Sequence, residues 1–185
     1  MAKALGGWMS RITHEEYIAI YDECHVLDSH MLAQDQAEFW WLIEQVQVLD
    51  PKKILEIGTD KGGTLKVWQK LVSPEGLTVS VDLISPRPEA TGDAPHVQII
   101  GDSHAPEIVA QIMEYAPFDF VFIDGDHSPA GVRQDHDNYR PMVKPGGLLG
   151  FHDTGKFGAV EESFKTFPGT KRTIHHTIGI GVIQL

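Results

Sequence analysis

Two places in the sequence combine acidic and imidazole side chains directly after an apolar run. The first is Ile123-Asp-Gly-Asp-His127, which follows Phe118-Asp-Phe-Val-Phe122. The second is the pair His152 and Asp153, which follows Leu148-Leu-Gly-Phe151. Carboxylates and imidazoles in such places can bind a divalent ion, transfer a proton, or only close a buried strand in a polar turn. The residue types alone leave these alternatives open.

Asp124, His152 and Asp153 are candidate ligands for one ion, because they stand at the ends of two predicted strands. Adjacent parallel strands lie about 4.8 Å apart, so these side chains can converge. Imidazole suits Mn²⁺, Fe²⁺, Co²⁺ or Zn²⁺, whereas Mg²⁺ prefers hard oxygen ligands. The alternative is that His152 and Asp153 only close their strand and cap the loop at Thr154–Lys156.

A glycine-rich turn, EIGTDKGGT, follows the first predicted strand. Gly58 permits a tight turn, and Gly62 and Gly63 allow a ligand to approach the free N–H groups of a helix. Asp60 stands where a dinucleotide-binding loop would have its second glycine. Glu56, two residues before Gly58, suits a cofactor with an ammonium group better than a pyrophosphate. A glycine-rich turn without a ligand is the alternative.

The next two predicted strands also end in polar residues. Asp82 comes about 20 residues after the glycine-rich turn, where an acid can accept hydrogen bonds from both hydroxyls of a ribose. Asp102 and Ser103 end the third strand and suit the edge of an adenine. Each acid alone would more often be a solvated loop residue, but three successive strand ends of this polarity favour a cofactor site.

The elements that must position these residues alternate along the chain. Short apolar runs predict strands, and the stretches between them have helical spacing of apolar residues. Such alternation implies βαβ crossovers and a mostly parallel sheet with helices on both faces. The predicted strands are 53–57, 77–82, 97–100, 118–124 and 147–152, and the predicted helices are 61–72, 105–115 and 129–143.

The two ends of the chain differ from this alternating pattern. Thr173–Ile174 and Gly179–Gln184 are too close for a helix between them, so we expect an antiparallel hairpin at one edge of the sheet. Before the first strand, Thr13–Val26 and residues 35–49 predict two helices. The prediction is therefore a doubly wound, Rossmann-like α/β domain with a seven-stranded sheet over residues 51–185, preceded by a helical extension over residues 1–50.

Two features of the extension carry specific expectations. Thr13 and Glu16 have the spacing of a capping box at a helix start. Phe39, Trp40 and Trp41 either pack the second helix on the sheet, which we favour, or form an exposed interface.

Composition and charge exclude several classes of protein. The chain of 185 residues has 26 acidic residues against 15 Lys and Arg, a net charge of -11, which argues against nucleic acid and anionic membranes as partners. Its one cysteine, Cys24, excludes an internal disulfide and fits the cytoplasm. We find neither a secretion signal nor an apolar run long enough for a membrane span.

In this order, the motifs EIGTxxGGT, VD, GDS, FIDGDH and PGGxxxxHD resemble those of class I S-adenosylmethionine-dependent methyltransferases. Within that class they look most like the branch of cephalosporin-hydroxylase-like proteins and metal-dependent sugar and small-molecule O-methyltransferases. The resemblance covers roughly residues 52–160 and implies S-adenosylmethionine as the cofactor. It implies cofactor contacts from Glu56 and Gly58 at the methionine end, from Asp82 at the ribose, from Asp102 and Ser103 at the adenine, and from Thr59, Gly62 and Gly63 in the loop.

The resemblance also implies a divalent metal on Asp124, His152 and Asp153, and His127 as the general base beside Asp124. Related O-methyltransferases have Asp-Asn or two acids where this chain has His152 and Asp153. This departure leaves open whether the ion is Mg²⁺, Mn²⁺ or another first-row metal, or whether no ion binds. Asp126 receives no role.

Three functions stay open: O-methylation of a small hydroxylated acceptor, an auxiliary role like that of cephalosporin-hydroxylase-like proteins, and non-catalytic binding of S-adenosylmethionine. An NAD-dependent dehydrogenase is a more distant fourth. The acceptor would be selected by the N-terminal helices and by loops 84–96 and 154–170, the first of which is a candidate lid or a cover on the adenine side. The sequence does not decide whether the chain forms a homo-oligomer.

Overall fold

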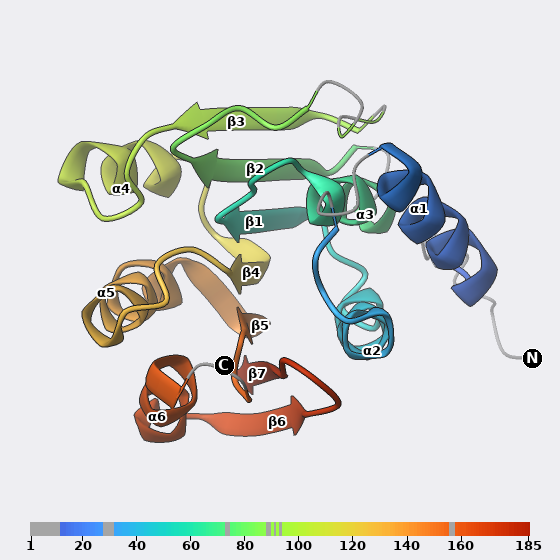
Figure 1. Cartoon of the computed structure of the whole chain (residues 1–185). Helices are drawn as coiled ribbons and strands as arrows, with labels where there is room; N and C mark the ends of the chain where they lie inside the picture. Colours follow the sequence, from blue (N-terminus) through green and yellow to red (C-terminus); the bar gives the residue numbers. More distant parts are fainter. Residues whose placement is uncertain are drawn as a thin grey trace, which may run out of the picture.

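Seven strands form one sheet in the order β3-β2-β1-β4-β5-β7-β6, with helices on both faces (Figure 1). The computed structural model describes residues 12–27, 32–72, 75–87, 90, 92, 94–155 and 158–185. The strands are β1 (Lys53–Ile57), β2 (Leu77–Asp82), β3 (His96–Ile100), β4 (Phe118–Ile123), β5 (Val143–His152), β6 (Thr170–Ile174) and β7 (Ile180–Gln184). Strands β1 to β5 pair in parallel, and β7 and β6 add an antiparallel hairpin. The predicted doubly wound sheet with its edge hairpin is confirmed.

The helices divide into two layers (Figure 1). α1 (His14–Leu27), α2 (Gln36–Gln47) and α3 (Gly63–Leu71) cover one face, and α4 (Pro106–Met113), α5 (Pro129–Tyr139) and α6 (Gly158–Thr166) cover the other. Successive side chains of β4 point to opposite faces, so Phe120 and Phe122 enter the first core and Val121 and Ile123 the second. This two-sided burial explains why β4 reads as a continuous apolar run.

Two neighbouring boundaries each differ from the prediction by four residues. The helix predicted over 129–143 ends at Tyr139, and a short 3₁₀ turn, Arg140–Met142, follows it. Pro141 has no backbone N–H to donate, so the helix does not continue through it. Strand β5 then begins at Val143, four residues earlier than predicted, and pairs with β4 through a shift in register between Phe118 and Phe120.

A helix lies within the segment 154–170, which the sequence analysis treated as a loop. α6 spans Gly158–Thr166 and buries Val160 and Phe164, four positions apart, against the second core. Its nine residues give only this one pair at helical spacing, a signal too short to separate from a loop. The hairpin strand β6 also begins at Thr170, three residues before the prediction.

Helices α1 and α2 share the first core with α3. The predicted capping box is confirmed: Glu16 Oε2 accepts from Thr13 N–H at 2.8 Å, and Thr13 Oγ1 accepts from Glu16 N–H at 3.2 Å. Phe39 is fully buried, and Trp40 and Trp41 pack partly buried against the same core. Packing on the sheet is therefore the confirmed alternative for this aromatic cluster. No helix in the described ranges is long and apolar enough to cross a membrane.

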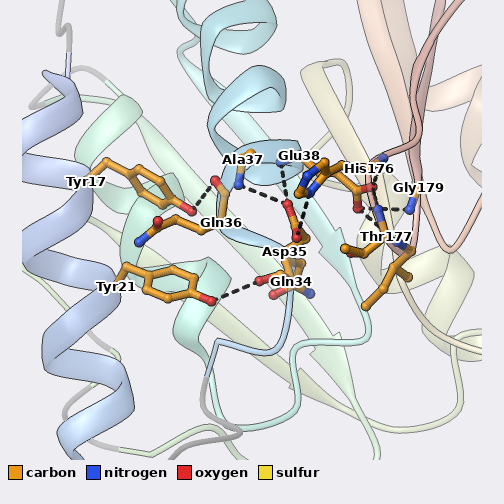
Figure 2. A network of polar contacts seen from close by, with 11 residues as sticks. Tyr17, Tyr21, Gln34, Asp35, Gln36, Ala37, Glu38, His176, Thr177 and Gly179 are labelled. Atoms are coloured by element: carbon orange, nitrogen blue, oxygen red, sulfur yellow. Dashed lines mark hydrogen bonds and ion pairs between the residues drawn. The ribbon is translucent and has the colours of Figure 1, made fainter.

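A buried carboxylate joins α2 to the turn between β6 and β7. Glu38 is fully buried, and its two oxygens accept hydrogen bonds from four successive backbone N–H groups, residues 176–179, at 2.5 to 3.3 Å (Figure 2). Asp35, which caps α2, also lies 3.2 Å from Nδ1 of His176. Two segments at opposite ends of the chain are thus held together by charge-assisted hydrogen bonds.

We expect Glu38→Gln to lower the free energy of unfolding by ~2–4 kcal/mol, because buried N–H groups would lose charged acceptors and meet an amide NH₂ group. Urea unfolding followed by circular dichroism measures the change. Glu44→Gln, at an exposed position of the same helix, is the control and should change stability by less than ~0.5 kcal/mol. Equal effects of the two substitutions would contradict the expectation.

Candidate functional site

A cavity of about 620 Å³ opens at the carboxyl ends of β1, β2, β3 and β4. This is the edge where ligands bind in doubly wound sheets. The predicted site residues in its wall are Gly58, Thr59, Asp82, Asp102, Ser103 and Asp124, and the wall also includes Asp60, Gln34 and Asp126. Glu56, Gly62, Gly63, His127, His152 and Asp153 lie outside the set of lining residues.

Gly58 allows the turns after β1 and β4 to interlock. It has a φ of 85°, and a Cβ at this position would lie 2.1 Å from the carbonyl oxygen of Asp124. The two turns are also joined by a hydrogen bond, which the N–H of Asp124 donates to the carbonyl of Ile57, the residue before Gly58, at 2.8 Å. The glycine therefore serves close backbone packing as well as the tight turn.

Gly62 packs against the loop that follows β2. Its φ is 88°, and an added Cβ would lie 2.4 Å from Cβ of Ala90 and 2.9 Å from Cβ of Pro86. Arg87 N–H donates to the carbonyl of Lys61 at 3.1 Å. The described part of this loop, the candidate lid, is thus packed on the start of α3, and the space that Gly62 leaves is filled by protein.

Glu56 has an incomplete set of partners. Its side chain is buried, and Oε1 accepts from the indole N–H of Trp68 at 2.7 Å. Within the described ranges, Oε2 of Glu56 and the buried Oγ1 of Thr59 form no hydrogen bond of normal geometry, although the side chains of Thr64 and Thr59 lie close enough to the carboxyl group to affect its pKa. Burial raises the pKa of Glu56 to about 8, although the side chains of Thr64, Trp68 and Thr59 act in the opposite direction. Buried polar atoms without partners are costly and indicate a place for a ligand.

Asp82 and Asp102 shape the turns in the cavity wall. Oδ2 of Asp82 accepts from the N–H of Asp60 at 2.7 Å, which ties the second strand end to the glycine-rich turn. Oδ1 of Asp102 accepts from the N–H of His104 at 2.9 Å. Both carboxylates are therefore held in place by backbone donors.

Two residues of α5 that the sequence analysis did not select support the wall at Ser103. The Ser103 hydroxyl donates to Asp135 Oδ1 at 3.1 Å, and the Tyr139 hydroxyl donates to the Ser103 carbonyl at 2.6 Å. Asp135 is fully buried; burial raises its pKa to about 6, against the lowering effect of His104. In the sequence, the only sign that Asp135 supports the wall is its place next to the apolar face of the predicted helix, between Val132 and His136.

The side chains of the two opening motifs meet at one point. Nδ1 of His152 lies 3.1 Å from Asp124 Oδ1 and 3.2 Å from Asp153 Oδ2. Nε2 of His127 lies 3.0 Å from Asp153 Oδ2 and 3.5 Å from Asp124 Oδ1. The structure thus brings together all four residues that the sequence placed at the ends of β4 and β5.

The contacts in this cluster lower the pKa of its acid Asp124 and raise the pKa of its imidazole groups. Burial alone would raise the pKa of Asp124, but His152 and His127 lower it to about 2. For His152, burial acts to lower the pKa, yet Asp124 and Asp153 raise it to about 10. The hydrogen bond with Asp124 raises the pKa of His127, against burial. Without an ion, the Asp124 carboxylate and the His152 imidazolium therefore form a buried ion pair, with the two groups 3.1 Å apart.

The same cluster has a donor set for a divalent ion. Ligand atoms of Asp124, His152 and Asp153 all lie within 4.8 Å of one another, and in the described ranges they are the only such group of acidic, His and Cys side chains. One nitrogen and two carboxylate oxygens fit a first-row ion such as Mn²⁺ or Zn²⁺. The second ring nitrogen of His152 is buried without a hydrogen-bond partner, so its ring orientation rests on the two carboxylates.

Asp126, to which the sequence analysis gave no role, holds the turn into α5. Its Oδ1 accepts from Ser128 N–H at 2.8 Å and its Oδ2 from the Ser128 hydroxyl at 2.9 Å. Ser128 in turn caps the helix by accepting from Gly131 N–H at 3.0 Å. The Asp126 side chain leaves no room for a Cβ on Gly131, which would lie 2.2 Å from its Oδ2.

A family model described as a methyltransferase domain matches residues 55–154, more than half of the chain. The matched stretch includes the ends of β1, β2, β3 and β4, which form the cavity, and the end of β5, which carries His152 and Asp153.

Solved methyltransferases have the same fold at low identity. The O-methyltransferase from Bacillus cereus, in complex with S-adenosylhomocysteine (SAH), aligns with a TM-score of 0.66 and 18% identity over 98% of this chain and 93% of its own. TomG from Streptomyces achromogenes, in complex with S-adenosylmethionine, aligns with a TM-score of 0.67 and 16% identity over 92% and 89%. MycE from the mycinamycin biosynthetic pathway, in complex with Mg, SAH and mycinamycin VI, aligns at 0.60 and 22% identity over 78% of this chain and 49% of its own, so this chain spans about half of MycE.

We expect Gly58→Ala to lower the free energy of unfolding by ~2–4 kcal/mol, because the added methyl group meets the Asp124 carbonyl and the backbone is left-handed. Urea unfolding measures this change. Gly158→Ala is the matched control, since a Cβ there, at the exposed start of α6, would meet no atom of the described residues within 4 Å. A Gly58→Ala protein as stable as the control would show that the two turns are not closely packed.

Proposed function

Because this chain belongs to the methyltransferase domain family and has the fold of class I S-adenosylmethionine-dependent methyltransferases, we propose that it O-methylates a small hydroxylated molecule. The observation that carries this proposal is the position of His127. Its Nε2 lies within 3.5 Å of Asp124, which itself lines the cavity. The imidazole that would accept the proton thus lies next to a residue of the cavity wall, at the end of the fourth strand.

The cofactor would lie across the ends of β1, β2 and β3. Glu56 Oε2 and Thr59 Oγ1, both buried and with no hydrogen bond of normal geometry in the described ranges, are the acceptors available to an ammonium group at the methionine end. Asp82 would bind the ribose, and Asp102 and Ser103 the adenine, as the resemblance implies. These assignments agree with the position of Asp82, Asp102 and Ser103 in the cavity wall.

The methyl acceptor would lie against Asp124, close to His127. Its hydroxyl gives a proton to the His127 imidazole, an oxygen electron pair forms the bond to the methyl carbon, and the carbon–sulfur bond breaks to leave SAH. The protein contributes orientation and proton transfer, since direct methyl transfer needs no covalent enzyme intermediate.

Asp124, His152 and Asp153 are the residues that would hold a divalent ion in this site. When bound, such an ion would neutralise the carboxylates, lower the pKa of the acceptor hydroxyl, and leave the His127 imidazole able to accept a proton. Imidazole in the donor set favours Mn²⁺, Co²⁺ or Zn²⁺ over Mg²⁺.

We expect the protein to form SAH from S-adenosylmethionine with at least one member of a panel of phenols, sugars and hydroxy acids. On that acceptor, His127→Gln should lower kcat by ~10²–10⁴-fold, the usual contribution of a general base, while SAH affinity by calorimetry stays unchanged. His175→Gln, at an exposed position of the β6–β7 turn, should retain full turnover.

Each other outcome of this assay selects a different function. SAH binding without turnover on any acceptor would favour an auxiliary protein or a binding module. Full turnover by His127→Gln would mean that another group accepts the proton. Absence of SAH binding would contradict the proposal as a whole.

We expect protein stripped of metal to bind Mn²⁺, measured by the loss of the free-ion signal in electron paramagnetic resonance. His152→Gln should weaken binding at least ~10-fold, because the imidazole donor is lost, and His175→Gln should not. If the wild type binds Mn²⁺, Co²⁺ and Zn²⁺ no better than His152→Gln does, then His152 and Asp153 only close their strand.

A further inference from the structure

Gln34 reaches the functional cluster from the segment that precedes α2. Its side-chain Nε2 donates to Asp124 Oδ2 at 2.7 Å, across 90 positions of sequence. The residue is 7% exposed and lines the cavity. It lies before the stretch matched by the methyltransferase domain model, which begins at residue 55.

Both neighbouring helices hold the backbone around Gln34 (Figure 2). From α1, the Tyr21 hydroxyl donates to the Gln34 carbonyl at 3.4 Å, and the Tyr17 hydroxyl donates to the Gln36 carbonyl at 2.9 Å. In α2, the Asp35 side chain caps the helix by accepting from two backbone N–H groups at 3.0 Å. The position of Gln34 is thus set by rigid elements.

The two oxygens of the Asp124 carboxylate have different partners. Oδ2 receives the Gln34 amide, and Oδ1 faces Nδ1 of His152 at 3.1 Å and Nε2 of His127 at 3.5 Å. A carboxylate turns about a single bond, so a fixed donor on one oxygen sets the direction in which the other points.

The Gln34 amide is not fully satisfied by the protein. Its Oε1 is buried and has no hydrogen-bond partner in the described ranges. A buried unpaired carbonyl costs stability, and this cost offsets part of the stability that the amide N–H contributes by binding Asp124. The amide is therefore better explained by what its N–H does to Asp124 than by stability.

We propose that Gln34 is a positioning residue of the methyl-transfer site, which orients Asp124 toward His127 and His152. The proposal rests on the proposed function for its effect on turnover, and on geometry alone for its effect on the cluster. It makes the segment before α2 part of the site.

Gln34→Met tests the role, because methionine keeps the length of glutamine without an N–H donor. We expect kcat to fall at least ~10-fold, SAH affinity to stay within about twofold, and the thermal midpoint to fall by only a few degrees, because Asp124 loses a donor while an unpaired buried carbonyl is removed. Gln36→Met, the same change at an exposed position two residues away, should leave all three unchanged. A wild-type kcat, or a loss of SAH affinity as large as the loss of kcat, would overturn the proposal.

Gln34→Glu gives a second variant with nearly the same shape. Its carboxylate cannot donate to Asp124 and repels it, so kcat should fall further than in Gln34→Met. A residue that only fills space would tolerate Glu at least as well as Met. Activity of Gln34→Glu at or above that of Gln34→Met would contradict a positioning role.

A measurement without turnover separates this inference from the proposed function. In ¹⁵N spectra of the histidine rings of metal-free protein, Gln34→Met should move the His152 and His127 signals, and Gln36→Met should not. Unmoved signals in Gln34→Met would overturn the inference even if the wild type is an active methyltransferase. Moved signals would support it even if no acceptor is turned over.

Discussion

The register between three parallel strands determines the rest of the site. Ile57 of β1 pairs with Ile123 of β4, and Ile123 pairs with Phe151 of β5. The next residues along the three strands are Gly58, Asp124 and His152, which therefore meet at one edge of the sheet. Because Gly58 has no side chain, the turn after β1 can lie against the Asp124 backbone. The glycine-rich turn after β1 and the polar residues at the ends of β4 and β5 are consequently parts of one continuous surface.

Segments from both ends of the chain complete this surface. The loop after β5 is held by the β6–β7 turn, because Thr154 N–H donates to the Gly179 carbonyl and Gly155 N–H to the Ile178 carbonyl, at 3.1 and 2.9 Å. The same turn is bound by Glu38 of α2. Asp153, next to this loop, has a φ of 61°, a left-handed conformation that costs energy in a residue with a side chain and needs such support.

The sequence predicted most of the sheet and the cluster at its edge, because buried strands and their polar ends leave periodic, local patterns. It missed α6, whose single apolar pair is too short a signal, and it missed Gln34 and Asp135, whose partners are distant in sequence. Asp119 shows that two acids in one short stretch of sequence can have different roles. It lies in the same apolar run as Asp124, yet it accepts from Lys52 and Lys53 N–H at 2.7 and 2.8 Å, and only the tertiary structure reveals this structural role.

The hydrogen bonds between Glu38 and the β6–β7 turn have a consequence for how this chain can diverge or be recombined. The length of the turn and the acid at position 38 constrain one another, since a turn with one residue more or fewer would present a different set of N–H groups. Relatives that change one should change the other. A chimera that takes its first helices from one homologue and its last hairpin from another should assemble only if both halves of this contact come from the same parent.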